Sequence, residues 1–345
     1  MQSCSLRLLP LLAAGLAACH SVTAPRSSLV GPGTGTQDGM QPYDTCLVTQ
    51  RLLLPDGASA AHAGRPFGIA LSSSRTAFVT LSEHRRLARA ELAGAAGGGP
   101  AFSQTIAVGA APTDVALNSR GTRAYVTNRF GGSISIVDVA LNRTIGTLGL
   151  AGKPWRVKVA PGDSILWATN DAGGIYAYRL STGHQVAALQ AHQPVNGVAV
   201  GGNGHAWFGL RNGTVVEVDT RTYRVSRTFT VGGYPQDVAL SPDGRQLYVA
   251  NALGMVQFLD LATGTVTTTI ALPGGGGFAL ALSDDGDDLY VSTGTASGKV
   301  WVIDPPERRI EHVIITGGVP RRIVIDRNGE GAVVANEDGF VDIIP

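Results

Sequence analysis

Charged and amide side chains recur at matched points along this chain, and their types suit the recognition of a small polar molecule. Carboxylates and guanidinium groups can pair with one another or with the charged groups of a ligand. Each of these residues lies two positions after a recurrent proline, at the start of a short apolar run. The charged members are Asp114, Arg156, Asp237 and Arg322, and Asn196 lies near the equivalent position of a further unit.

A second set of amides ends other short apolar runs. Asparagine often bonds the local backbone in turns, so a structural role stands beside a binding role for these residues. Trp155, next to Arg156, either lines the same pocket or fills a gap between sheets. The amides of this set are Asn128, Asn170, Asn251 and Asn336.

The elements that must position these residues form a repeat. Its clearest copy is residues 235–251, where two β-rich runs flank the turn sequence Pro242-Asp243-Gly244. Successive copies are spaced by 46, 42, 40, 41, 42 and 43 residues. A period of about 40–45 residues with only strand and turn signals predicts a β-propeller, one four-stranded blade per repeat. The anchors that open the repeats are Pro66, Pro112, Pro154, Pro194, Pro235, Gly277 and Pro320.

Seven anchors predict an all-β fold, a seven-bladed propeller of antiparallel blades. The last repeat stops after its third strand, at residues 340–345, while the run 45–54 precedes the first anchor and lacks another partner. We expect this run to supply the fourth, outer strand of the last blade, because an open ring would leave unpaired edges. The first repeat matches least well, with a charged run at 86–92 and a glycine loop at 94–100.

Strand direction brings both polar sets to one face of the disc. The innermost strand of a blade begins where the second strand ends, so their flanking residues meet at one mouth of the central channel. We therefore expect the two polar sets and Trp155 to form a binding site at this channel mouth.

The first residues predict export and anchoring. Arg7 and the apolar run 8–18 are typical of a secretory signal peptide. Leu16-Ala17-Ala18-Cys19 resembles the lipobox of bacterial lipoproteins, which implies cleavage before Cys19 and lipidation of its thiol. An ordinary signal peptide followed by a chance cysteine is the alternative. The expected organisation is a signal peptide at 1–18, a flexible tether rich in Ser, Thr, Gly and Pro at 19–44, and the propeller at 45–345.

Ala124-Tyr125-Val126-Thr127-Asn128 and Leu247-Tyr248-Val249-Ala250-Asn251 resemble the YVTN-type β-propeller repeat family. The resemblance covers residues 45–345 and implies the propeller fold. It implies less about function, because that family includes surface proteins and binding proteins. Related seven-bladed propellers include lactonases, quinoprotein dehydrogenases and haem d1 domains.

Composition and residue spacing argue against several functions. The chain has 27 Lys and Arg against 26 Asp and Glu, so it lacks the basic surplus of a nucleic-acid binder. The histidines fall at unmatched positions without zinc-ligand spacing. A calcium ion could sit beside acidic ring residues, but Arg156 and Arg322 oppose it. A nucleophile-elbow pattern with Ser, Asp and His is absent from the sequence. We expect neither a metal nor a cofactor.

These observations together predict a membrane-anchored, extracytoplasmic binding scaffold rather than an enzyme. It would be a monomer in the cell envelope, at the outer membrane or on the periplasmic side, held by lipidated Cys19. Its partner would be an envelope protein or a small ligand at the channel mouth. The alternative is a propeller enzyme of lactonase or quinoprotein-dehydrogenase type, with Asp114, Asp237 and Asn170 as polar groups of the pocket.

Overall fold

The computed structural model describes residues 43–48, 50–54, 64–92, 100–327 and 331–345. Within these ranges the chain forms strands and turns, and it contains no helix long and apolar enough to cross a membrane. The predicted signal peptide, Cys19 and nearly all of the tether lie outside the described residues. The same holds for residues 93–99, which include most of the predicted glycine loop.

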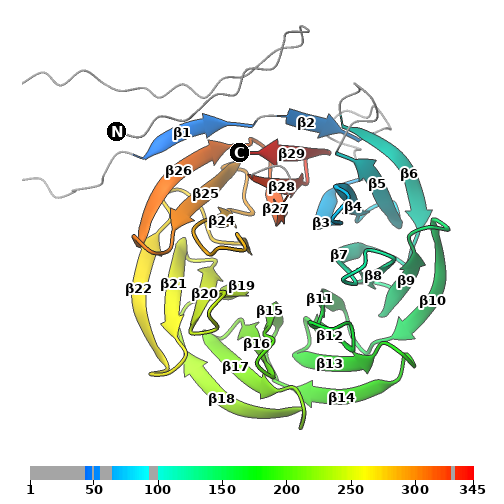
Figure 1. Ribbon diagram of the computed structural model, residues 1–345, viewed down its shortest axis with the longest axis horizontal. Helices are drawn as coiled ribbons and strands as arrows, with labels where there is room; N and C mark the ends of the chain where they lie inside the picture. Colours follow the sequence, from blue (N-terminus) through cyan, green and yellow to red (C-terminus); the bar gives the residue numbers. More distant parts are fainter. Residues whose placement is uncertain (1–42, 49, 55–63, 93–99, 328–330) are drawn as a thin grey trace, which may run out of the picture.

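Seven sheets radiate around a central axis, as the repeat predicts (Figure 1). Blades 1 to 4 each contain four consecutive antiparallel strands, in order from the channel to the rim. Blade 1 is β3 (Pro66–Leu71), β4 (Thr76–Leu81), β5 (Arg86–Glu91) and β6 (Ala101–Ala107). Blade 2 is β7 (Pro112–Leu117), β8 (Arg123–Asn128), β9 (Ser133–Asp138) and β10 (Arg143–Gly149). Blade 3 is β11 (Pro154–Val159), β12 (Ile165–Asn170), β13 (Gly174–Arg179) and β14 (Gln185–Gln190). Blade 4 is β15 (Val195–Val200), β16 (His205–Leu210), β17 (Thr214–Asp219) and β18 (Arg224–Thr230).

Blades 5 to 7 continue the ring, and the last two include strands from the N-terminal run. Blade 5 is β19 (Pro235–Leu240), β20 (Gln246–Asn251), β21 (Met255–Asp260) and β22 (Thr265–Ala271). Blade 6 contains β23 (Ala279–Leu282), β24 (Leu289–Ser292), β25 (Lys299–Asp304) and β26 (Arg309–Ile315), with β1 (Asp44–Leu47) at its rim. Blade 7 is β27 (Pro320–Asp326), β28 (Gly331–Asn336), β29 (Phe340–Ile344) and β2 (Gln50–Leu53).

The N-terminal run closes the ring, but as two strands rather than the single strand predicted at 45–54. β2 pairs antiparallel with β29, with Gln50 opposite Ile343, and so supplies the fourth strand of the last blade as predicted. β1 departs from the prediction, because it pairs parallel with β26 in the neighbouring blade. The reason is length: β29 has five residues and can pair with only half of the run. The remainder reaches the next available sheet edge, which belongs to β26.

An ion pair whose carboxylate is buried fixes this closure. The Nε atom of Arg51 on β2 lies 2.7 Å from Oδ1 of Asp342 on β29, whose side chain is fully buried. The Arg51 guanidinium also donates to the carbonyl oxygen of Thr316, in the loop between blades 6 and 7. It lies 3.6 Å from the centroid of the Phe340 ring as well. One side chain of the added strand thus joins two blades.

The apolar core lies between the blades. Trp167 of blade 3 and Phe208 of blade 4, both fully buried, have ring centroids 5.4 Å apart. Alternate residues of each strand face the neighbouring blade, so a single sheet cannot bury its apolar residues alone. This packing makes the ring a rigid frame for the inner strands that surround the channel.

Candidate functional site

Four charged residues predicted for the channel mouth do lie together around the channel. They occupy the same position of four inner strands, and we call them the charged ring: Asp114, Arg156, Asp237 and Arg322. Strand register places small residues at this position in the other blades, namely Gly68, Gly197 and Ala279. A Cβ on Gly197 would lie 2.8 Å from Asp237 Cα, so glycine there lets adjacent inner strands approach closely.

The charged ring is connected across the channel by ion pairs. Nη2 of Arg156 lies 2.8 Å and 3.0 Å from the two carboxylate oxygens of Asp237, and its Nη1 lies 3.5 Å from Asp114. Nη1 of Arg322, on the opposite side, lies 3.3 Å from Asp237. Asp237 also accepts backbone N–H groups of Val238 and Leu280. Asp237 is therefore fully engaged in holding the ring together.

The two arginines keep unused donors. Nε of Arg156 and Nε of Arg322 are buried and lack a hydrogen-bond partner among the described residues. Arg322 is only 3% exposed. Its burial, and next its neighbour Arg156, lower the pKa of the Arg322 guanidinium to about 10, so it remains a cation at neutral pH.

Lys158 adds a third cation, and sequence reasoning missed it. It lies on β11 two residues after Arg156, and alternate residues of a strand share one side. The equivalent residues of the other inner strands, which pair with their second strands in the same register, are Ala70, Ala116, Ala199, Ala239, Ala281 and Val324. A lysine among small apolar residues at one repeat position was the available signal, and only an alignment by strand register exposes it.

The Lys158 ammonium borders the channel and makes no ion pair with the described residues. Its side chain is exposed to the water of the channel, and the channel wall surrounds that water with protein. This enclosure, and next the Arg156 guanidinium, lower the pKa of Lys158, whereas Asp237 and Asp114 act in the opposite direction. Lys158 is thus a charged group available to a ligand.

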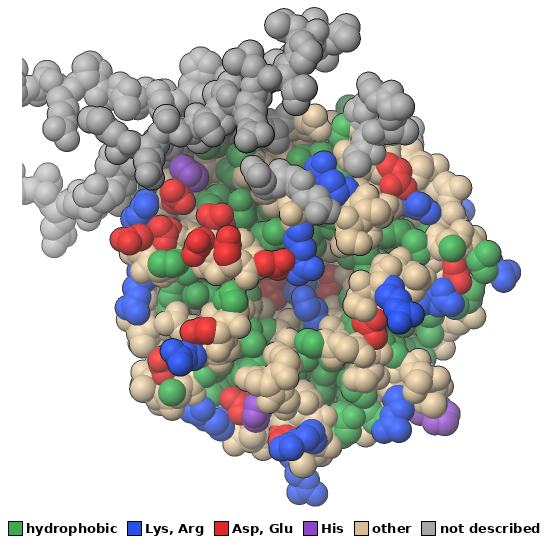
Figure 2. Space-filling view, viewed as in Figure 1, with side chains coloured by type: hydrophobic (Ala, Val, Ile, Leu, Met, Phe, Trp, Pro, Cys, Tyr) green, Lys and Arg blue, Asp and Glu red, His purple; other side chains and the backbone are tan. Residues whose placement is uncertain are grey.

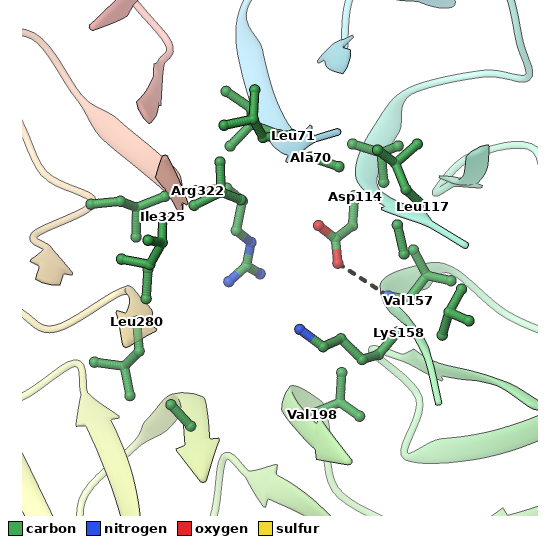
Figure 3. A pocket seen from close by; sticks show the side chains of 18 of the residues that line it. Ala70, Leu71, Asp114, Leu117, Val157, Lys158, Val198, Leu280, Arg322 and Ile325 are labelled. Carbon is green, nitrogen blue, oxygen red and sulfur yellow. Dashed lines mark hydrogen bonds between the residues drawn. The ribbon is translucent and has the colours of Figure 1, made fainter. Parts of the chain in front are cut away.

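These groups line a cavity of about 600 Å³ inside the channel. The cavity extends from the charged ring toward the turns that follow the inner strands, where Arg327 pairs with Asp284 at 2.8 Å. Arg322, Asp114 and Lys158 direct their charged ends into the same space (Figure 3). Figure 2 shows Lys or Arg side chains deep in the central hollow of the disc. At the level of the charged ring and Lys158, three cations face two carboxylates, whereas the whole lining, which also includes Arg327, Asp284 and Asp326, carries four of each.

The predicted asparagines do not line this cavity. Each is buried and ties the end of the second strand to the loop that enters the same blade. In blade 5, Asn251 Nδ2 donates to the Gly232 carbonyl at 3.0 Å, and Asn251 Oδ1 accepts the Tyr234 N–H at 2.9 Å. The other three asparagines also bond loop residues three positions before their anchors. Asn170 and Asn336 donate to the carbonyls of Ala151 and Gly317, whereas Asn128 Oδ1 accepts the Gly109 N–H.

Trp155 and Asn196 lie one residue before the ring level, outside the cavity lining. Trp155 and Phe67 meet edge to face with ring centroids 5.4 Å apart, and Phe67 meets Phe278 at 5.9 Å. Asn196 donates to Gln236 Oε1 at 3.3 Å. The cavity lining thus begins at the charged ring, on the far side from these residues. Binding by the ring, the asparagines or Trp155 stays a prediction.

The described residues contain no group of three His, Cys, Asp or Glu side chains arranged to hold a metal ion.

The fold and channel define this chain as a seven-bladed β-propeller. No family model matches the chain, and neither does any curated protein. Among solved structures it is similar to the Kuenenia stuttgartiensis protein described as hydrazine synthase, with a TM-score of 0.74 and 16% sequence identity. The match covers 82% of this chain and 96% of that one. At this identity the likeness concerns the fold alone.

Proposed function

We propose that this protein is a lipid-anchored, extracytoplasmic propeller of the YVTN type that binds a small organic anion in its central channel. The observation that carries the proposal is the excess of cations at the level of the charged ring and Lys158 in this cavity, where Lys158 has no ion pair among the described residues. A cavity of about 600 Å³ fits a small molecule rather than a folded partner protein. A carboxylate there would pair with Lys158 and with the guanidinium groups of Arg156 and Arg322, which line the cavity.

Calorimetry with matched ligands tests the binding. We expect lactate and succinate to bind, and the corresponding neutral amides to bind far more weakly. Lys158→Gln should weaken carboxylate binding about 10- to 100-fold, because a charge-assisted hydrogen bond is worth about 1.5–3 kcal/mol. Lys153→Gln is the control, since Lys153 lies outside the cavity near Phe130. Equal affinity for acids and amides, or equal loss in both variants, would contradict the proposal.

Anchoring needs a separate test, because the motif around Cys19 lies outside the described residues. The lipobox-like Leu16-Ala17-Ala18-Cys19 and the apolar run before it support a lipoprotein. Wild-type protein expressed in a Gram-negative host should incorporate labelled palmitate and sediment with membranes. Cys19→Ala should lose both properties while the protein is still exported. Membrane association of the Cys19→Ala variant would argue against lipid anchoring.

The enzymatic alternative is tested on the same purified protein. Hydrolysis of lactones with added calcium, or quinone-linked dehydrogenation, would favour a propeller enzyme over a binding scaffold. Turnover that depends on Asp114 and Asp237 would replace our proposal.

A further inference from the structure

The amine of Lys158 is placed for more than electrostatic attraction. The chain contains three lysines, Lys153, Lys158 and Lys299, and only Lys158 lines the cavity. Most cationic positions in this protein are arginine, whose guanidinium cannot act as a nucleophile at neutral pH. Lys158 is therefore the one lysine in the cavity lining, and the other cations of that lining are arginines.

The neighbours of Lys158 supply what an amine needs to react with a carbonyl compound. Arg322 and Arg156 line the cavity, and their guanidinium groups would hold the carboxylate of a ligand. The Arg322 guanidinium and the Lys158 ammonium enter the pocket from opposite sides, with the Asp114 carboxylate beside them (Figure 3). A ligand held by arginine would therefore present its other end to Lys158.

The small residues at the equivalent positions leave space around the amine. Alanine or valine at the other six positions of this layer keeps these inner-strand residues short, so they do not crowd Lys158. The lowered pKa of Lys158, caused first by its enclosure within the channel and then by Arg156, increases the share of neutral, nucleophilic amine at a given pH.

We propose that Lys158 captures 2-oxo acids covalently, by forming an imine between its Nζ atom and the ligand's keto carbon. This step rests on the proposed anion site. The neutral amine attacks the carbonyl carbon, a C–N bond forms, and a proton moves from nitrogen to the carbonyl oxygen to give a carbinolamine. The remaining proton on nitrogen then joins the hydroxyl, which leaves as water, and the C=N bond forms. Asp114 is the carboxylate placed to carry the proton, and no oxidant or reductant is needed.

Reductive trapping tests the imine. Purified protein is incubated with pyruvate and sodium cyanoborohydride, digested, and analysed by mass spectrometry for the N-carboxyethyl group that reduction leaves on lysine. We expect Lys158 to be labelled while Lys153 and Lys299 remain unlabelled over the same time. Lys158→Arg, which keeps a cation but lacks a primary amine, should lose the adduct completely.

A comparison of pyruvate with lactate separates this proposal from the binding function. The two acids differ in the keto group, so calorimetry should show tighter binding of pyruvate. If both acids bind equally and no adduct forms, the imine is overturned and the anion site stands. If neither acid binds, both proposals fail. Equal labelling of all three lysines would also overturn the imine, because it would show unselective modification.

Discussion

At the scale of single residues, the channel divides its charged groups between structure and ligand binding. Asp237 contacts two guanidinium groups and two backbone N–H groups, so its oxygens are occupied. Lys158, one layer away, has no ion pair among the described residues. Breaking a buried ion pair costs more free energy than the pair contributes, because the other charge is left buried without a partner. The pairs of Asp237 therefore hold the charged ring in place, and Lys158 stays available to a ligand.

The buried asparagines give a prediction that separates a structural role from a binding role. Asn251→Ala removes four hydrogen bonds, to Gly232, Gln257, Tyr234 and Leu253. We expect a loss of about 2 kcal/mol in the free energy of unfolding, because buried backbone groups lose their partners. Anion affinity should not change. Urea unfolding and calorimetry measure the two quantities, and an unchanged stability with weaker binding would restore Asn251 as a binding residue.

The repeat pattern predicts which residues share a position in the blades better than it predicts what their side chains contact. The charged ring was predictable because its members share one repeat position. The asparagines share a position too, but whether their amides point to the channel or to the loop depends on backbone geometry that spacing does not encode. Lys158 was missed because its significance appears only against the alanines of other blades. The prediction for Asn196 was off by one residue, because strand register puts Gly197 at the ring position.

At the scale of elements, β2 depends on the ion pair between Arg51, which is partly exposed, and Asp342, which is fully buried. Burial raises the pKa of Asp342 to about 6, although the Arg51 hydrogen bond and charge act to lower it. The folded protein therefore binds this proton more tightly than the unfolded chain. The contribution of Asp342 to stability is greatest below the ordinary carboxyl pKa and is lost as pH rises through about 6.

This sign predicts a pH-dependent cost for loss of Arg51. Arg51→Met leaves a buried carboxylate unpaired at pH 8, which should cost roughly 2–3 kcal/mol of unfolding free energy. At pH 5 Asp342 takes up a proton, so the cost of Arg51→Met should be smaller. Urea unfolding at both pH values measures the difference. Arg221→Met is the control, because Arg221 is 86% exposed and should change stability little at either pH. An equal loss at both pH values would show that the charge of Asp342 is not the cause.

The division of the N-terminal run into β1 and β2 shows where element prediction stops. Its composition indicates one continuous strand, and closure of blade 7 follows from the missing outer strand. That β1 ends at Leu47 and β2 begins at Gln50 depends on the five-residue length of β29 and on the free edge of β26, two strands that lie far along the chain. Local sequence cannot specify a boundary that distant strands impose.

At the scale of the whole molecule, the ring is closed by strands from opposite ends of the chain. Arg51 and Asp342 are 291 residues apart in sequence, whereas almost every other strand pairs with a neighbour in sequence. Loop-closure entropy must be overcome before this long-range contact contributes, so closure of blade 7 should limit the folding rate.

A circular permutant tests this. Pro345 and Gln50 lie near each other, because Gln50 pairs with Ile343, and an Asn-Gly turn of about four residues can join them. The permuted chain would begin at Gly64 and end at Leu54, with β29 and β2 now a local hairpin. Its matched control is the linear chain that starts at Gln50, which lacks β1 equally. We expect the same cooperative unfolding and circular dichroism in both, with faster refolding of the permutant in stopped-flow experiments, because the slow long-range pairing has become local. Equal refolding rates would show that another step limits folding, and a permutant that fails to form the ring would show that closure requires the native order of the strands.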